Sequence, residues 1–182
     1  MGFKVGEKVV YPNHGIGIIE EIASRELGPQ TSNFYMLRLT ATDSVVMVPV
    51  ANATEVGLRS PIKLKDGERL LKLLSDDFAA PPADWKDRYK EFLEKMRTGD
   101  VFTVAEVLKT LSYLSLRKPL SFREKRMLER ARFLVVSEIS LAFRKPDATV
   151  ETIVDEALAK ACSKHTGTGT RVAAAAARAA AG

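Results

Sequence analysis

The hydrophobic pattern of this chain changes its period near residue 60, and this change limits the possible folds more than any other feature. Before it, short apolar runs alternate with polar residues and are separated by turn residues such as Pro12-Asn13-His14-Gly15. A period of two is typical of β-strands. After it, apolar residues recur every three or four positions, as on one face of an α-helix. Strands followed by helices predict an α+β protein.

The first 60 residues predict a small β-barrel of the Tudor or SH3 type. Gly15 and Gly17 permit the sharp curl that small barrels need. Gly28–Asn33 reads as a loop, and Thr42-Asp43-Ser44 as a turn. The expected strands are Lys8–Tyr11, Gly15–Ile22, Phe34–Leu39 and Val45–Val50.

Alternation assigns the residues of the last two strands to two faces. The interior set is Tyr35, Leu37, Leu39, Val46, Val48 and Val50, and the outer set is Phe34, Met36, Arg38, Val45 and Met47. The outer set is more apolar than a free surface usually is. It is therefore either a docking surface or a face that the helical part covers.

From residue 61 the sequence predicts a compact all-α part of four or five helices. Asp66 begins a short first helix, and Trp85 to Arg97 forms the second. A third runs from Asp100 or Thr103, where Thr103 and Glu106 form a possible capping box, to Leu116. Ser121-Phe122-Arg123-Glu124 is a stronger capping box and opens the longest helix, to Phe143; a last helix covers Val150 to Cys162.

The predicted domains are therefore residues 1–60, residues 61–162 and a low-complexity tail at 163–182. The tail is rich in alanine, which favours a helix. A short helix without an apolar partner is marginal in water, so we expect a mobile segment.

Positive charge gathers in the helical part. Residues 1–60 hold 5 Lys/Arg and 6 Asp/Glu, a net charge of −1, whereas residues 61–182 hold 23 and 17, a net charge of +6. Within the helical part, residues 117–132 alone hold 7 basic and 2 acidic residues. Such a concentrated field suits a polyanion, most plainly a nucleic acid. A solvated helix face remains the alternative.

Trp85, the single tryptophan, follows a proline turn and precedes a run of cations. Asp84 is placed to cap the helix that begins there. An apolar side chain among cations resembles the wedges with which minor-groove proteins part stacked bases. However, Trp85, Tyr89, Phe92 and Met96 also have the spacing of a core-facing stripe, and spacing alone favours the core for Trp85.

The chain offers no catalytic or metal-binding pattern. His14 lies in a turn and His165 in the tail, so neither is placed as a general base. Cys162 is the single cysteine, which excludes an internal disulfide and the common zinc spacings. No apolar stretch is long enough for a membrane span. We expect a soluble cytoplasmic protein that is not an enzyme and needs no cofactor or metal.

Several motifs together resemble the CarD/CdnL family of CarD-like bacterial transcription regulators. They are Phe3-Lys4-Val5-Gly6-Glu7-Lys8-Val9-Val10-Tyr11-Pro12-Asn13-His14-Gly15, Val48-Pro49-Val50-Ala51-Asn52-Ala53, Leu93-Glu94-Lys95 with Gly99-Asp100-Val101, and Glu124-Lys125-Arg126-Met127-Leu128. The resemblance covers residues 1–162 in one register. A related N-terminal module occurs in transcription-repair coupling factors, so the combination is the specific signal.

The resemblance implies a monomeric regulator, associated with the nucleoid through RNA polymerase. Its Tudor-like domain binds the polymerase β subunit, and its helical domain contacts promoter DNA at the upstream edge of the melted bubble. The tryptophan that matches Trp85 wedges into the minor groove and stabilises the open complex. The wedge is then favoured over the core for Trp85.

The resemblance also assigns site residues by position. Arg25 matches an arginine that contacts polymerase, and Leu27 an adjacent apolar contact. Met47 stands where some relatives have a second contacting arginine, and apolar contact from Met36 and Met47 is the expected replacement. The expected DNA contacts are Trp85, Lys86, Arg88, Lys90, Lys125, Arg126 and Arg130. The alternative function is a protein-binding adaptor whose helical domain anchors it to nucleic acid without specificity.

Overall fold

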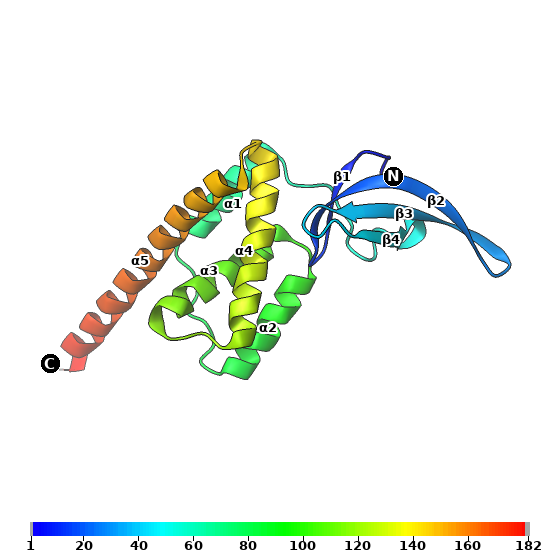
Figure 1. Cartoon of the computed structure of the whole chain (residues 1–182). Coiled ribbons are helices and arrows are strands. Elements are labelled where there is room, and N and C mark those ends of the chain that lie inside the picture. Colours follow the sequence, from blue (N-terminus) through cyan, green and yellow to red (C-terminus); the bar gives the residue numbers. More distant parts are fainter. Residues whose placement is uncertain (1, 181–182) are drawn as a thin grey trace.

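In the computed structural model, which describes residues 2–180 and their side chains up to His165, a curled sheet precedes a group of helices (Figure 1). The antiparallel strands pair in chain order: β1 (Lys8–Tyr11), β2 (Gly15–Leu27), β3 (Gln30–Leu39) and β4 (Val45–Pro49). A short 3-10 helix, η1 (Val50–Asn52), follows them. The predicted α+β fold is confirmed, with the sheet as an open half-barrel.

β2 and β3 form a longer hairpin than predicted. Their pairing continues to Leu27 and Gln30, so only Gly28 and Pro29 form the turn, and the expected loop over residues 28–33 is wrong. Gly28 has a φ of +66°, a value that tight turns use and that glycine adopts without strain. The outer half of the hairpin is solvated on both faces. Its residues are therefore mostly polar and lack the apolar alternation that predicts a strand.

The interior of the sheet follows the predicted alternation. Tyr35, Leu37, Leu39 and Val48 are buried together with Val9 and Ile19. Among the residues predicted to face outward, Phe34 is an exception, because its side chain is buried. Its neighbours along the ladder are Ala23 and Pro49, and this end of the outer face is less open than alternation alone suggests.

The helices within the described residues are α1 (Leu64–Ser75), α2 (Trp85–Arg97), α3 (Val101–Arg117), α4 (Phe122–Phe143) and α5 (Asp147–Ala180). The predicted capping box of α4 is present. The box proposed for Thr103 and Glu106 is wrong, because the Asp100 carboxylate accepts from the backbone amides of Phe102 and Thr103 and starts α3 earlier. Similarly, α1 begins two residues before Asp66.

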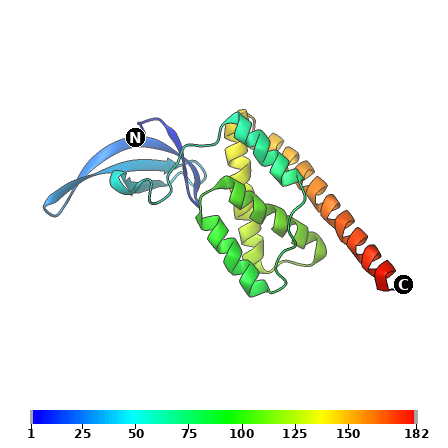
Figure 2. The same ribbon diagram turned by 180° about the vertical axis from the view of Figure 1, so that it is seen from behind.

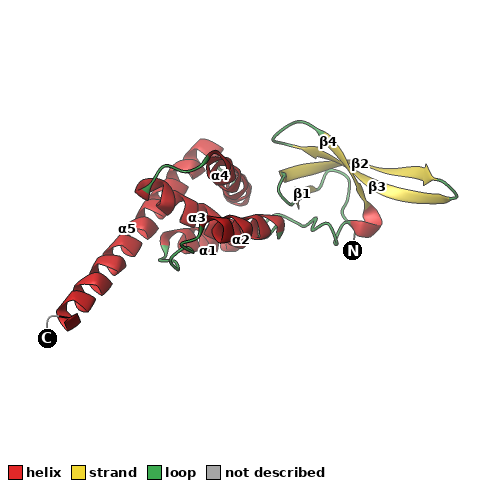
Figure 3. Cartoon of the chain, turned by 90° about the horizontal axis from the view of Figure 1, so that it is seen from below, coloured by secondary structure: helices red, strands yellow, loops and turns green. Residues whose placement is uncertain are grey.

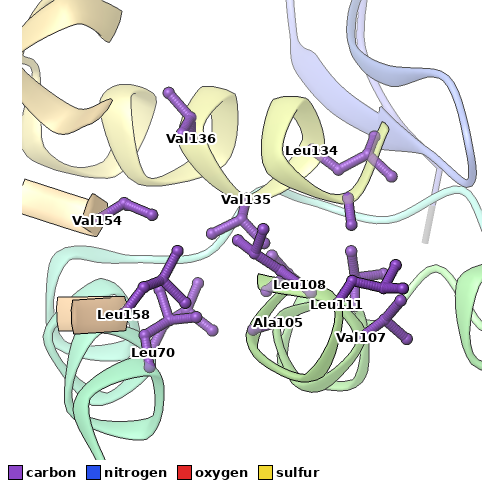
Figure 4. Packing of buried hydrophobic residues seen from close by; sticks show 14 of the residues in the cluster. Leu70, Ala105, Val107, Leu108, Leu111, Leu134, Val135, Val136, Val154 and Leu158 are labelled. Atoms are coloured by element: carbon purple, nitrogen blue, oxygen red, sulfur yellow. The ribbon is translucent and has the colours of Figure 1, made fainter. Parts of the chain in front are cut away.

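The core of the helical part forms where α3 packs against its neighbours. Leu108 and Leu111 of α3 are fully buried, as are Leu70 of α1, Val135 of α4 and Val154 of α5. Figure 4 shows these side chains converging from four helices. The buried face of α4 lies on this side and includes Met127, Ala131, Leu134 and Val135.

α5 extends well beyond the end predicted for it. Its backbone continues past Cys162 to Ala180 and projects from the other helices (Figure 2). The first part of α5 packs into the core through Val150, Val154 and Leu158. Because that part is already helical, alanines added to its end avoid the cost of nucleation that an isolated helix bears.

The sheet lies beside the helices (Figure 3), and Arg59 joins the two parts. The backbone of Arg59 pairs with Val10, and its guanidinium donates to both carboxylate oxygens of Glu138 on α4, at 2.5 and 2.9 Å. Nε and Nη2 of Arg59 also donate to the Gly99 carbonyl, at 2.9 and 2.8 Å. The joint therefore connects the sheet, the α2–α3 turn and α4 in one network.

Candidate nucleic-acid interface

Trp85 occupies the first position of α2, where the side chain points back beyond the helix end. Asp84 caps this end, and its Oδ1 accepts from the backbone amides of Lys86 and Asp87 at 2.7 and 3.3 Å. The indole is 57% exposed. The core-facing stripe of α2 begins one turn later, at Tyr89, and continues through Phe92 and Met96. The interpretation of Trp85 as a core residue is therefore wrong.

The end of α2 that carries Trp85 is anchored from within by Arg88. The Arg88 side chain is only 3% exposed, Nη1 donates to the Pro82 carbonyl at 2.9 Å, and Nη2 donates to Glu124 Oε1 at 3.1 Å. A buried and paired guanidinium is not presented to a phosphate. Arg88 thus lies inside the protein, whereas a DNA contact was predicted for it. Its contacts hold the proline turn and α2 against the start of α4.

Glu124 accepts hydrogen bonds from Ser121 as well as from Arg88. Its Oε2 accepts from the backbone amide and the hydroxyl of Ser121, each at 2.9 Å. Burial acts to raise the pKa of Glu124, but the hydrogen bonds from Ser121 and Arg88 outweigh it and lower that pKa below its ordinary value. The carboxylate is therefore charged at neutral pH, and it keeps the first turns of α2 and α4 together.

The remaining predicted DNA contacts are exposed cations. Lys86 and Lys90 lie on α2, and Lys125, Arg126 and Arg130 on α4. Lys86 Nζ lies 5.8 Å from the centre of the Trp85 ring, and Arg130 Nη1 donates to the Asn13 carbonyl at 2.9 Å. None of the five forms an ion pair with a carboxylate that the structure describes. Their charge is thus available to a ligand.

The structure adds residues to this surface that the sequence pattern did not single out. Phe122, the first residue of α4, is 73% exposed. Arg97 and Arg123 are exposed too, and with Phe122, Arg126 and Arg130 they line a groove between α2 and α4. The capping box at Ser121 was the signal for Phe122, since it fixes the next residue at the first, outward-pointing position of the helix.

A second exposed surface follows the outer face of the sheet. The strand register places Arg25, Leu27, Met36 and Met47 on the same face, because Met36 pairs with both Glu21 and Met47. Beyond the register shift between Ile19 and Glu21, the odd residues of β2 from Glu21 to Leu27 share that side. Met47 is 46% exposed and Val45 is exposed as well. The helices thus leave Val45 and Met47 uncovered, whereas Phe34 on the same face is buried.

Neither histidine belongs to a catalytic arrangement in the part of the chain that the structure describes. His14 stacks on Tyr11, with ring centres 4.9 Å apart. His165 stacks on Phe78 at 4.3 Å, and its Nδ1 lies 2.9 Å from Asp77 Oδ1. Among residues 2–180 no three His, Cys, Asp or Glu side chains are grouped to hold a metal ion. Within the same residues no helix has the length and apolar character to cross a membrane.

Comparison with known proteins identifies both parts of the chain. Residues 3–62 match the model of the CarD-like/TRCF RID domain, and residues 69–155 match that of the CarD C-terminal domain. A relative from Bacillus subtilis (strain 168), named "Putative transcription factor YdeB", is 29% identical over 139 residues. This match covers 76% of the present chain and 91% of the relative. Together the two domain matches cover most of the sequence.

Proposed function

Since the chain belongs to the CarD-like family of transcription regulators, we propose that it binds RNA polymerase through its sheet and promoter DNA through its helices. In this proposal residues 1–60 bind the polymerase β subunit, with Arg25, Leu27, Met36 and Met47 at the contact. Residues 61–162 bind the DNA at the upstream edge of the bubble. Trp85 enters the minor groove there and stabilises the open complex.

The observation that carries the proposal is the placement of the indole. A large aromatic ring that stays exposed contributes little to the stability of the fold, yet the helix that presents Trp85 is capped by Asp84 and fixed by the buried side chain of Arg88. An exposed apolar side chain at an anchored helix end, with Lys86 and Lys90 of the same helix free of ion pairs in the described part of the chain, suits insertion between bases at a junction that is already distorted. The cations then contact phosphates and position the protein without reading sequence.

The lifetime of the promoter bubble tests the wedge. We expect Trp85→Ala to change the free energy of unfolding by less than about 0.5 kcal/mol, because the side chain lies outside the core. The same variant should shorten the lifetime of the open complex severalfold on a purified promoter while still binding polymerase. Leu64→Ala, which removes a 55% exposed side chain from the first position of α1, is the matched control. An unchanged lifetime for Trp85→Ala contradicts the proposal.

The contact with polymerase has its own test, which also separates the adaptor alternative. Arg25 lies on the outer half of the β2–β3 hairpin, opposite Ser32. We expect Arg25→Glu to abolish capture of the isolated polymerase β subunit without altering binding to duplex DNA. Lys8→Glu, a charge reversal of the same size at the start of β1, is the control. If Arg25→Glu leaves capture intact, the adaptor reading is preferred.

A further inference from the structure

We propose that the groove between α2 and α4 binds an unpaired stretch of single-stranded DNA, with Phe122 as the stacking platform and four arginines as phosphate contacts. The inference deepens the proposed function and rests on it for the source of that strand, which is the one that Trp85 separates. It also names residues that belong to neither of the two predicted contact sets, namely Phe122, Arg97 and Arg123.

The groove has a defined shape. It encloses about 550 Å³ between the two helices and ends at Asn13 of the β1–β2 turn. Sites for small molecules and single bases have volumes of roughly 300–1,000 Å³. Arg130 Nη1 donates to the Asn13 carbonyl, so the turn of the sheet is fixed to the α4 side of the groove. The groove thus has walls from both helices, and the β1–β2 turn borders it at Asn13.

Its floor and its rim differ in character. The floor is apolar, with Met96 and Met127 buried and Tyr89 and Leu93 half-buried. The rim carries four exposed arginines, Arg97, Arg123, Arg126 and Arg130. Within residues 2–180 no carboxylate forms an ion pair with any of the four. An apolar floor below unpaired cations is complementary to a ligand that has flat apolar faces and regularly spaced negative charges.

Phe122 decides between the polyanions that could fit. Its ring is 73% exposed, and the Arg126 guanidinium lies 5.6 Å from the ring centre. In single strands every base has a free face, and stacking of a base on an exposed aromatic side chain stabilises binding without regard to sequence. A duplex hides these faces inside the helix. Because Phe122 borders a groove whose apolar floor can accept an unstacked base, its exposed ring favours a single strand.

The groove also lies where a separated strand is available. The Arg88–Glu124 pair joins the first turns of α2 and α4, and these turns carry Trp85 and Phe122. Figures 1 and 2 show both first turns at the same end of the helical part. Tyr89, one turn after Trp85 on α2, lines the groove. A strand displaced by the indole can thus enter the groove past Phe122.

Binding to the isolated protein tests the inference without polymerase. The probe is a fluorescein-labelled twelve-nucleotide oligothymidylate, compared with a twelve-base-pair duplex by fluorescence anisotropy. We expect Phe122→Ala to weaken binding of the single strand about tenfold and to change duplex binding less than twofold, since stacking contributes only to the former. Phe122→Leu should behave as Phe122→Ala does, whereas Phe122→Trp should retain affinity. Leu64→Ala, at the first position of α1, should bind as the parent does.

The arginines have a separate readout. Arg123→Gln with Arg126→Gln should lower the slope of log affinity against log salt by about 1.4 for the single strand, while Lys145→Gln, beyond the other end of α4, should lower it by much less. Equal loss of single-strand and duplex affinity in Phe122→Ala overturns the inference, as does displacement of the oligothymidylate by polyglutamate at equal charge. Either result leaves the effect of Trp85→Ala on bubble lifetime standing, so the two proposals fail separately.

Discussion

The two ends of α4 each hold a glutamate that pairs with an arginine from another part of the chain, and the two pairs are built differently. Near the end of the helix, both oxygens of Glu138 accept from Arg59, and Oε1 also accepts from the Ile62 amide at 3.0 Å. At its start, Glu124 accepts from Arg88 through one oxygen only. The Arg88 Nε is buried without a hydrogen-bond partner in the described structure.

This difference indicates which contact is held more firmly: the sheet against α4, or the start of α2 against α4. The Arg59 pair is bidentate and shares a network with Gly99, so the sheet is held in one orientation against α4. Gly99 also fits closely against the sheet, since a Cβ at that position would lie 2.8 Å from Pro12 Cγ. The Arg88 pair carries an unsatisfied donor, which costs about 1–3 kcal/mol. The spacing between sheet and helices is thus more firmly set than the anchorage of Trp85.

Removing the carboxylate of Glu138 should have the largest effect. Glu138→Ala leaves the Arg59 guanidinium and the Ile62 amide without their acceptor, and breaking a buried pair costs about 3–5 kcal/mol. Because the Arg59 side chain is 29% exposed, we expect a loss of unfolding free energy near the lower end, about 3 kcal/mol. Urea denaturation followed by far-UV circular dichroism measures it. Glu129→Ala, exposed on the same helix, should change stability by less than about 0.5 kcal/mol, and a comparable loss there refutes the special role of Glu138.

Replacing Arg88 should have a smaller effect on stability, because Arg88→Met keeps the buried stem and removes the unpaired Nε. We expect a loss of about 1–2 kcal/mol from the freed Pro82 carbonyl and Glu124 carboxylate. The bubble lifetime should also fall, since the helix end that carries Trp85 is released.

The salt dependence of duplex binding distinguishes this anchoring role from a phosphate contact. Lys90→Met removes an exposed cation and should lower the slope of log affinity against log salt by about 1. Arg88→Met should leave that slope unchanged, because the Arg88 guanidinium is buried in the protein. An equal reduction in both variants shows instead that Arg88 leaves its buried pair and reaches DNA.

Features that depend on neighbouring residues could be predicted from the sequence. The bounds of α2, the cap at Asp84 and the capping box of α4 were all correct, because each arises from a side chain within three residues of the helix end. The alternation of β3 likewise placed Tyr35, Leu37 and Leu39 inside. Local propensity did not predict the full length of an element that neighbouring structure extends, as at the β2–β3 hairpin and the end of α5.

Features that depend on distant residues could not be predicted. Arg59 and Glu138 are 79 positions apart, and Arg88 and Glu124 are 36 apart. The resemblance therefore grouped Arg88 with Lys86 and Lys90 as DNA contacts, although of these three cations only Lys86 and Lys90 are exposed. One signal was present: Arg88 lies four residues before Phe92, on the face of α2 that is buried. Composition finds the charge of a surface, but burial decides which of its cations are available.

The weaker pair should also respond to acid. The hydrogen bonds from Ser121 and Arg88 lower the pKa of Glu124 in the folded protein despite its burial, so the folded state binds fewer protons than the unfolded state as pH falls. The stability contributed by the charged carboxylate is thus fully present above the ordinary glutamate pKa and is lost as pH falls through the lower folded value.

Glu124→Gln isolates this contribution, since a protonated glutamic acid and a glutamine are both uncharged. We expect the parent to be more stable than Glu124→Gln by about 1 kcal/mol at pH 7, and this gap to close below about pH 4. Urea denaturation between pH 3 and pH 7 measures the gap, and Glu129→Gln should show no comparable closing. A gap that stays constant or widens in acid means that the Glu124 charge does not hold the end of α2, and that the anchorage of Trp85 comes from the Arg88–Pro82 contact alone.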